Sequence, residues 1–87
     1  MVSYEDVATA VCRILSTAKS RQYVVTIRAV IRELGREIPH GVLRAVLNRY
    51  AFKYMRVGGD VGKYVVDVES ARSICEKIIR RKKRARF

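Results

Sequence analysis

The sequence predicts a single, mainly helical α+β domain with the element order helix, strand, helix, helix, β-hairpin, helix. Three observations support this fold class. Apolar residues recur every three or four positions through most of the chain, as in amphipathic helices. After Phe52 this period gives way to alternation, and a glycine-rich segment separates two runs of β-forming residues. The length of 87 residues allows one domain, because a separate core needs roughly 50 residues or more.

The first predicted helix begins after Ser3, which has the spacing of a capping box with Asp6. Its apolar stripe consists of Val7, Val11, Ile14, Leu15 and Ala18. Residues 19–22 form a polar break. Residues 23–25 follow as a run of β-formers too short for more than a single rung of strand pairing.

The second predicted helix is capped by Thr26 and ends at Gly35, since glycine is favoured just past a helix end. Its buried face comprises Ile27, Val30, Ile31 and Leu34. Pro39 suits the first turn of a third helix. The inward residues of that helix are Leu43, Val46, Leu47 and Tyr50.

The predicted hairpin has strands over 54–57 and 64–68, joined by the glycine-rich loop 58–62. Asp67 caps a last helix, whose inward residues are Ala71, Ile74, Cys75 and Ile78. That helix runs into a segment of adjacent like charges, which repel one another and cannot fold alone. We therefore expect a domain over residues 1–79 and a basic C-terminal tail over residues 80–87.

Positive charge is the strongest compositional signal. Lys and Arg total 19 and Asp and Glu total 8, giving a net charge of +11. Six bases lie in the tail: Arg80, Arg81, Lys82, Lys83, Arg84 and Arg86. Without them 13 bases face 8 acids, so the remainder is still +5. Solubility alone needs a charge of only about 2–8 in a small domain, whereas a polyanion relieves a larger surplus. The charge therefore favours nucleic acid as the partner.

The element order resembles the winged helix-turn-helix family, in a small archaeal form with a helix at each end. The resemblance covers roughly Val24 to Val68 by element order, and another α+β packing of the same elements is the alternative. It implies that the third helix enters the major groove, with the hairpin as a wing that touches the minor groove or backbone. The scarcity of Asn and Gln suits a thermophile.

The third helix carries the expected reading residues. Its outward face would hold Gly41, Ala45, Asn48 and Phe52, flanked by Arg44 and Arg49. Arginine pairs with guanine or phosphate, and asparagine pairs with adenine. Asp60 is the only acid between Ile38 and Val66, although a solvated surface usually mixes both signs. The candidate binding residues are His40, Gly41, Arg44, Asn48, Arg49, Lys53, Arg56, Gly59, Lys63 and the six tail bases.

We therefore expect a DNA-binding protein, either a transcription regulator or a chromatin-type protein. The alternatives are an RNA-binding ribosomal or ribonucleoprotein component and, ranked below it, a protein–protein adaptor. Many proteins of this kind form dimers, and the apolar first or last helix could supply the interface. The absence of an apolar run of about 20 residues and of a secretory signal predicts a cytoplasmic protein, at the nucleoid or ribosome.

Neither catalysis nor a cofactor is expected. His40 is the only histidine, and no serine, cysteine or carboxylate pair can be placed beside it as a nucleophile–base set. Cys12 and Cys75 are too few for a zinc site. If the first and last helices are neighbours a disulfide is conceivable, but free thiols rank first because intracellular disulfides are rare outside hyperthermophiles. No metal, cofactor or small-molecule substrate is expected.

Overall fold

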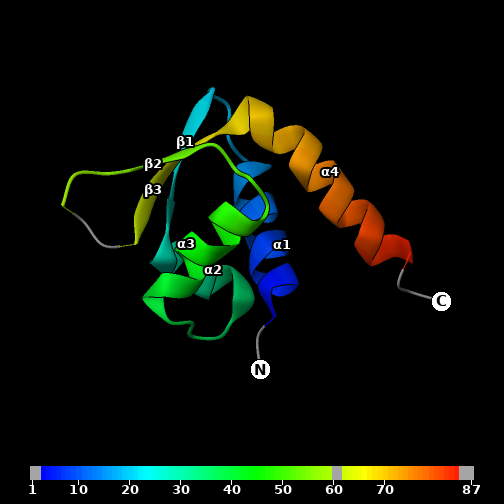
Figure 1. The fold of residues 1–87 in the computed structure, drawn as a ribbon, viewed down its shortest axis with the longest axis horizontal. Helices are drawn as coiled ribbons and strands as arrows, with labels where there is room; N and C mark the ends of the chain where they lie inside the picture. Colours follow the sequence, from blue (N-terminus) through cyan, green and yellow to red (C-terminus); the bar gives the residue numbers. More distant parts are fainter. Residues whose placement is uncertain (1–2, 60–61, 85–87) are drawn as a thin grey trace.

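Four helices and one three-stranded antiparallel sheet make up the part of the chain that the structure describes, a mainly helical α+β fold (Figure 1). The coordinates are a computed structural model that describes residues 3–59 and 62–84. The predicted element order is confirmed. In chain order the elements are α1 (Tyr4–Leu15), β1 (Gln22–Thr26), α2 (Ile27–Leu34), α3 (His40–Arg49), β2 (Tyr54–Arg56), β3 (Lys63–Asp67) and α4 (Val68–Arg84).

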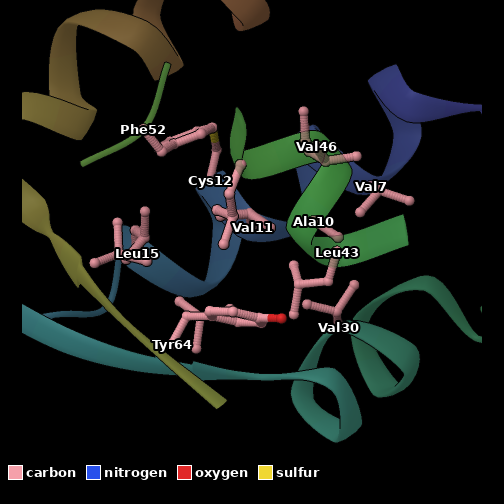
Figure 2. Packing of buried hydrophobic residues seen from close by; sticks show 14 of the residues in the cluster. Val7, Ala10, Val11, Cys12, Leu15, Val30, Leu43, Val46, Phe52 and Tyr64 are labelled. Carbon is pink, nitrogen blue, oxygen red and sulfur yellow. The ribbon is translucent and has the colours of Figure 1, made fainter. Parts of the chain in front are cut away.

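Helix α1 lies at the centre of the fold and contacts α2, α3, α4 and β1. Its capping box is confirmed, since Ser3 Oγ accepts from the Asp6 N–H (3.1 Å) and Asp6 Oδ2 from the Ser3 N–H (3.4 Å). Burial extends well beyond the single predicted stripe. The buried residues are Val7, Ala8, Thr9, Ala10, Val11, Cys12 and Leu15. Figure 2 shows several of them packed among side chains from α2, α3 and the sheet.

Helix α2 begins and ends where the sequence predicts. Thr26 is the N-cap and its Oγ1 accepts from the Ala29 N–H (3.1 Å). Gly35 ends the helix with a φ of 72°, a left-handed conformation that costs glycine little. Both the Thr26 cap and the Gly35 stop depend on residues close together in the sequence, so they can be predicted without knowledge of the tertiary fold.

The sheet has the strand order β1-β3-β2, with β3 in the centre. Strand β1 pairs with β3 along its whole length, from Gln22 opposite Asp67 to Thr26 opposite Lys63. The expectation of a single rung is therefore wrong. Residues 22 and 26 are polar, so the sequence around them does not predict a strand. The pairing with β3 determines the length of β1.

The two faces of the sheet differ in burial. Side chains alternate along a strand, so Val25, Tyr64 and Val66 share one face, which is buried against the helices. Val24 and Met55, which lie on the opposite face, are exposed. The core is thus a layer between one face of the sheet and the helices.

Helix α4 starts after Asp67, whose Oδ1 accepts from the Glu69 N–H (3.2 Å), as expected of a cap. It packs on α1 and continues to Arg84, so the backbone of 80–84 is a helical continuation where we expected an unfolded tail. Figure 1 shows this end projecting from the body. No described helix is both long and apolar enough to span a lipid bilayer.

Cys12 of α1 and Cys75 of α4 form a disulfide, with their Cα atoms 5.6 Å apart. The expectation of two free thiols is therefore wrong. Packing of α4 directly on α1 places the two residues within the Cα separation that a disulfide requires. The bond joins residues 63 positions apart and so closes most of the chain into one loop.

Replacing both cysteines by alanine should lower the free energy of unfolding by about 2–4 kcal/mol, because the unfolded chain regains the entropy of an open loop. Denaturant melts of the wild type and of the Cys12→Ala, Cys75→Ala variant measure this difference. Wild-type protein unfolded without reductant should show no thiol that reacts with a chromogenic reagent. Two reactive thiols per chain would contradict the disulfide.

Candidate functional site

Helix α3 is held to the core by one face and presents the other to solvent. Leu43, Val46 and Leu47 are fully buried, as predicted, and Tyr50 is half-buried against the core. Gly41, Arg44 and Asn48 are exposed, and Ala45 is half-buried. The predicted division of α3 into an inward and an outward face is confirmed for these residues.

Phe52 is the exception to the predicted outward face. It is buried, because α3 ends at Arg49 and the chain then turns at Ala51, which has a φ of 60°. The Phe52 N–H donates to the Leu47 carbonyl oxygen (2.9 Å), which closes the turn and directs the phenyl ring into the core. The helical period ends with α3 at Arg49, so it does not determine where the Phe52 side chain points.

Tyr54 joins the hairpin to α3. Its hydroxyl donates a hydrogen bond to Asn48 Oδ1 (2.6 Å), and its ring packs edge-on against the ring of buried Tyr64, with the centroids 5.4 Å apart. A continuous path of contacts therefore runs from the core, through β3 and β2, to the outward face of α3. Tyr54 is not among the predicted binding residues, and its only signal in the sequence is an aromatic residue in the strand that follows α3.

The end of the hairpin loop is anchored to the first residues of α2 and α3. The Gly62 carbonyl oxygen accepts from the Ile27 N–H (2.8 Å), and Gly62 is buried with a φ of 81°. A Cβ on Gly62 would lie 2.9 Å from Ile27 Cγ2 and 3.5 Å from His40 Nδ1. This close approach brings His40, one of the predicted binding residues, beside the loop.

Six residues of α3 and β2 together form what we call the α3–hairpin face. They are His40, Gly41, Arg44, Asn48, Tyr54 and Arg56. Arg56 lies two residues after Tyr54, so both point to the side of the sheet that α3 occupies. The face contains no acidic residue. No described carboxylate lies within 4.0 Å of the Arg44 or Arg56 guanidinium nitrogens.

The other predicted binding residues do not join this face. Lys53 lines a depression with Met55 and Val65 on the outer side of the sheet, and Tyr54 and Arg56 of the same edge strand also border it. Lys63 lies opposite Thr26 and alternates with inward Tyr64, which also places it on the outer side. Arg49 lies over the ring of Tyr4 of α1, with its guanidinium carbon 5.7 Å from the ring centroid. The expected single basic surface is thus divided.

The bases of the C-terminal segment are remote from the hairpin. Arg80 and Arg81 are exposed near the end of α4, and Figure 1 shows that end and the hairpin at opposite ends of the longest axis. Only the backbone is described for Lys82, Lys83 and Arg84, and Arg86 lies outside the described residues. Gly59 is exposed in the hairpin loop, with open space around it.

The chemistry available at the α3–hairpin face is hydrogen bonding and positive charge. In the described part of the chain, no three side chains of the metal-ligating types converge. Both cysteines are used in the disulfide. The face therefore offers guanidinium, amide, imidazole and backbone N–H donors, which suit a ligand rich in oxygen acceptors.

Comparisons with protein-family models, with curated proteins and with solved structures found no match. The geometry and charge of the α3–hairpin face are therefore the basis for assigning a function.

Gly62→Ala should destabilise the protein by about 2 kcal/mol or more, because alanine is strained at positive φ and its methyl group would overlap Ile27. Gly59→Ala is the matched control, since its added methyl group meets open space and its φ is not positive. Thermal melts of both variants measure the difference. Equal melting temperatures for the two variants would show that the loop is not anchored at Gly62.

Tyr54→Phe should leave the fold intact and release Asn48. Loss of one exposed hydrogen bond should cost about 0.5–1 kcal/mol of unfolding free energy, while the edge-on packing against Tyr64 remains. In an NMR spectrum the side-chain amide resonances of Asn48 should move more than those of Gln22, which lies on β1 and is separated from Tyr54 of β2 by strand β3. An unchanged Asn48 amide would contradict the hydrogen bond.

Proposed function

We propose that this protein binds nucleic acid, and double-stranded DNA in particular, through the α3–hairpin face. The observation that carries the proposal is an acid-free helix face whose asparagine is held in place by the neighbouring hairpin. A face that served only solubility would be expected to mix charges of both signs. The role we assign is that of a transcription regulator or a chromatin-type protein.

Asn48 and Arg44 are the proposed readers of base edges. Arg44 can form bidentate hydrogen bonds with guanine or contact a phosphate, and Asn48 can pair with adenine. The Tyr54 hydroxyl occupies one lone pair of Asn48 Oδ1, which leaves the second lone pair and the amide N–H groups for a base. Because the side chain is already oriented, less rotamer entropy is lost on binding.

The start of α3 supplies the proposed phosphate contact. Pro39 is the N-cap and makes no side-chain capping hydrogen bond, and the first turn of α3 contains no acid. The Val42 N–H donates to the Pro39 carbonyl oxygen (3.1 Å), so the N–H groups of His40 and Gly41 are the ones proposed for the anion. The N–H groups of a helix start carry partial positive charge and suit an anion. Exposed Gly41 adds no side chain that would hold a phosphate away from them. His40 stands at the same end, beside Gly62.

The architecture supports the same proposal. The order of helices and strands is that of the winged helix-turn-helix family, to which we assign the fold. In this assignment α3 is the recognition helix and the β2–β3 hairpin is the wing. Figure 1 shows the hairpin extending away from the helices, where it would reach a neighbouring stretch of backbone.

The basic end of α4 adds affinity without sequence preference. Its bases lie on consecutive helical turns that would repel one another, and phosphates would neutralise them. This end is separate from the α3–hairpin face, so the two contacts are expected to act independently. In this proposal α3 recognises base edges, and the end of α4 attracts the phosphate backbone of any sequence.

Arg44→Gln should weaken binding to duplex DNA by about 1–3 kcal/mol, roughly 5- to 150-fold, and lower the salt dependence of binding. Arg72→Gln, the same charge change on an exposed residue of α4, is the control and should lose much less. Fluorescence anisotropy with a labelled duplex at 50 and 200 mM salt measures both effects.

Three outcomes would overturn the proposal: no duplex binding by the wild type, binding insensitive to salt, or equal losses in both variants. A structured RNA of matched length belongs in the same titration. Tighter binding to that RNA than to DNA would instead favour the ribonucleoprotein alternative.

A further inference from the structure

Strand β1 forms an edge of the sheet and carries no charge. It comprises Gln22, Tyr23, Val24, Val25 and Thr26, without glycine or proline. The exposed fractions of Tyr23 and Val24 are 36% and 47%. In a chain with 19 Lys and Arg residues, a five-residue strand without charge at the edge of a sheet is a distinct feature.

The opposite edge of the sheet is protected and β1 is not. Strand β2 is only three residues long, includes Arg56 and follows Lys53. Short length and cationic side chains are the devices that keep an edge strand from pairing with another chain. Strand β1 itself contains no cation, although Arg21 precedes it as Lys53 precedes β2, and Ser20 Oγ donates to the Gln22 carbonyl oxygen (2.6 Å). The other backbone groups on this edge, and the second lone pair of that carbonyl oxygen, are open to a further strand.

We propose that β1 pairs with β1 of a second copy of this chain, antiparallel and about a two-fold axis at Val24. Full overlap of the two strands places Val24 opposite itself, Tyr23 opposite Val25, and Gln22 opposite Thr26. The central pair joins two exposed Val24 side chains, and β-branched residues are favourable cross-strand partners. The symmetric pairing uses the same surface of each copy, as a two-fold dimer requires.

The outer face of the sheet supports this axis. Val24 lies opposite Val65, and Val65 lies opposite Met55, so one apolar row crosses all three strands. Joining two copies at β1 would continue this row through six strands, with the two Val24 side chains in contact at the centre. The row ends at the open edge of the sheet, and the same row of a second copy of the chain would extend it across that edge.

The first and last helices are less suited than β1 to pairing with a second copy of the chain. Most apolar residues of α1 are buried within the monomer, with Tyr4 exposed and Ile14 half-buried, and most of the exposed residues of α4 are charged. Two basic α4 ends would repel one another. At the β1 seam, in contrast, neither strand contains a charged side chain, so the paired strands do not repel.

This pairing goes beyond the proposed nucleic-acid binding and does not depend on it. A pair of five-residue strands is smaller than a standard interface, so we expect weak association, in the range of micromolar dissociation constants. The net charge of +11 on each copy opposes it. Added salt should therefore strengthen the dimer, because screening reduces the repulsion.

Sedimentation equilibrium at several protein concentrations and at low and high salt tests the proposal. The wild type should approach the dimer mass, and Val24→Lys should remain monomeric because two like charges would face each other at the axis. Met55→Lys places the same charge on the same face but away from the seam, and should dimerise like the wild type. A monomeric wild type, or a Val24→Lys variant that still dimerises, would overturn it.

Cysteine trapping provides a second measurement that does not need a stable dimer. Directly opposite residues of an antiparallel pair have Cα atoms about 4.5–5.5 Å apart, a separation that a disulfide can bridge. Val24→Cys should therefore give a covalent dimer on mild oxidation that reductant reverses, while Met55→Cys stays monomeric. No trapping at position 24, or equal trapping at both positions, would overturn the β1 seam.

Discussion

The burial of α1 between the other elements is the constraint on which the rest of the fold depends. A three-stranded sheet has one face to cover, and α2, α3 and α4 each need a partner for an apolar stripe. Helix α1 contacts all three helices and β1, and its small residues Ala8 and Ala10 allow close approach. The Cys12–Cys75 disulfide fixes α4 to the same helix. The packing of α3 on α1 therefore fixes the orientation of α3 in the fold.

The α3–hairpin face inherits its rigidity from this core by two routes. One route runs from buried Tyr64 to Tyr54 and on to Asn48, so the amide of α3 is positioned by the sheet. The other runs from Gly62 to the start of α2 and to His40. Because both routes reach α3, the hydrogen-bonding groups of the α3–hairpin face keep one relative geometry although they come from different elements. A site held by packed elements loses little entropy on binding.

The features that were predictable from sequence are those with local causes. The capping box at Ser3, the Thr26 cap, the stop at Gly35 and the inward face of α3 each follow from residues a few positions apart. The failures are non-local. The length of β1 depends on β3, the disulfide depends on the packing of α4 against α1, and the turn at Ala51 redirects Phe52. The division of the basic residues between two sides of the sheet is not predictable in this way, because the charges in a sequence carry no information about which side of a sheet a lysine faces.

Segregation of charge links the two proposals made for this protein. Bases lie on the α3–hairpin face, on the outer side of the hairpin and at the end of α4, and also on α1, α2 and the two sides of β1, at Arg21 and Arg28, while β1 itself has none. Repulsion between two copies at +11 each is the main cost of bringing their β1 strands together. Nucleic acid bound at α3 would neutralise part of that charge and leave the β1 edge uncovered. Binding and pairing would therefore favour each other, and by thermodynamic linkage the coupling would be equal in both directions.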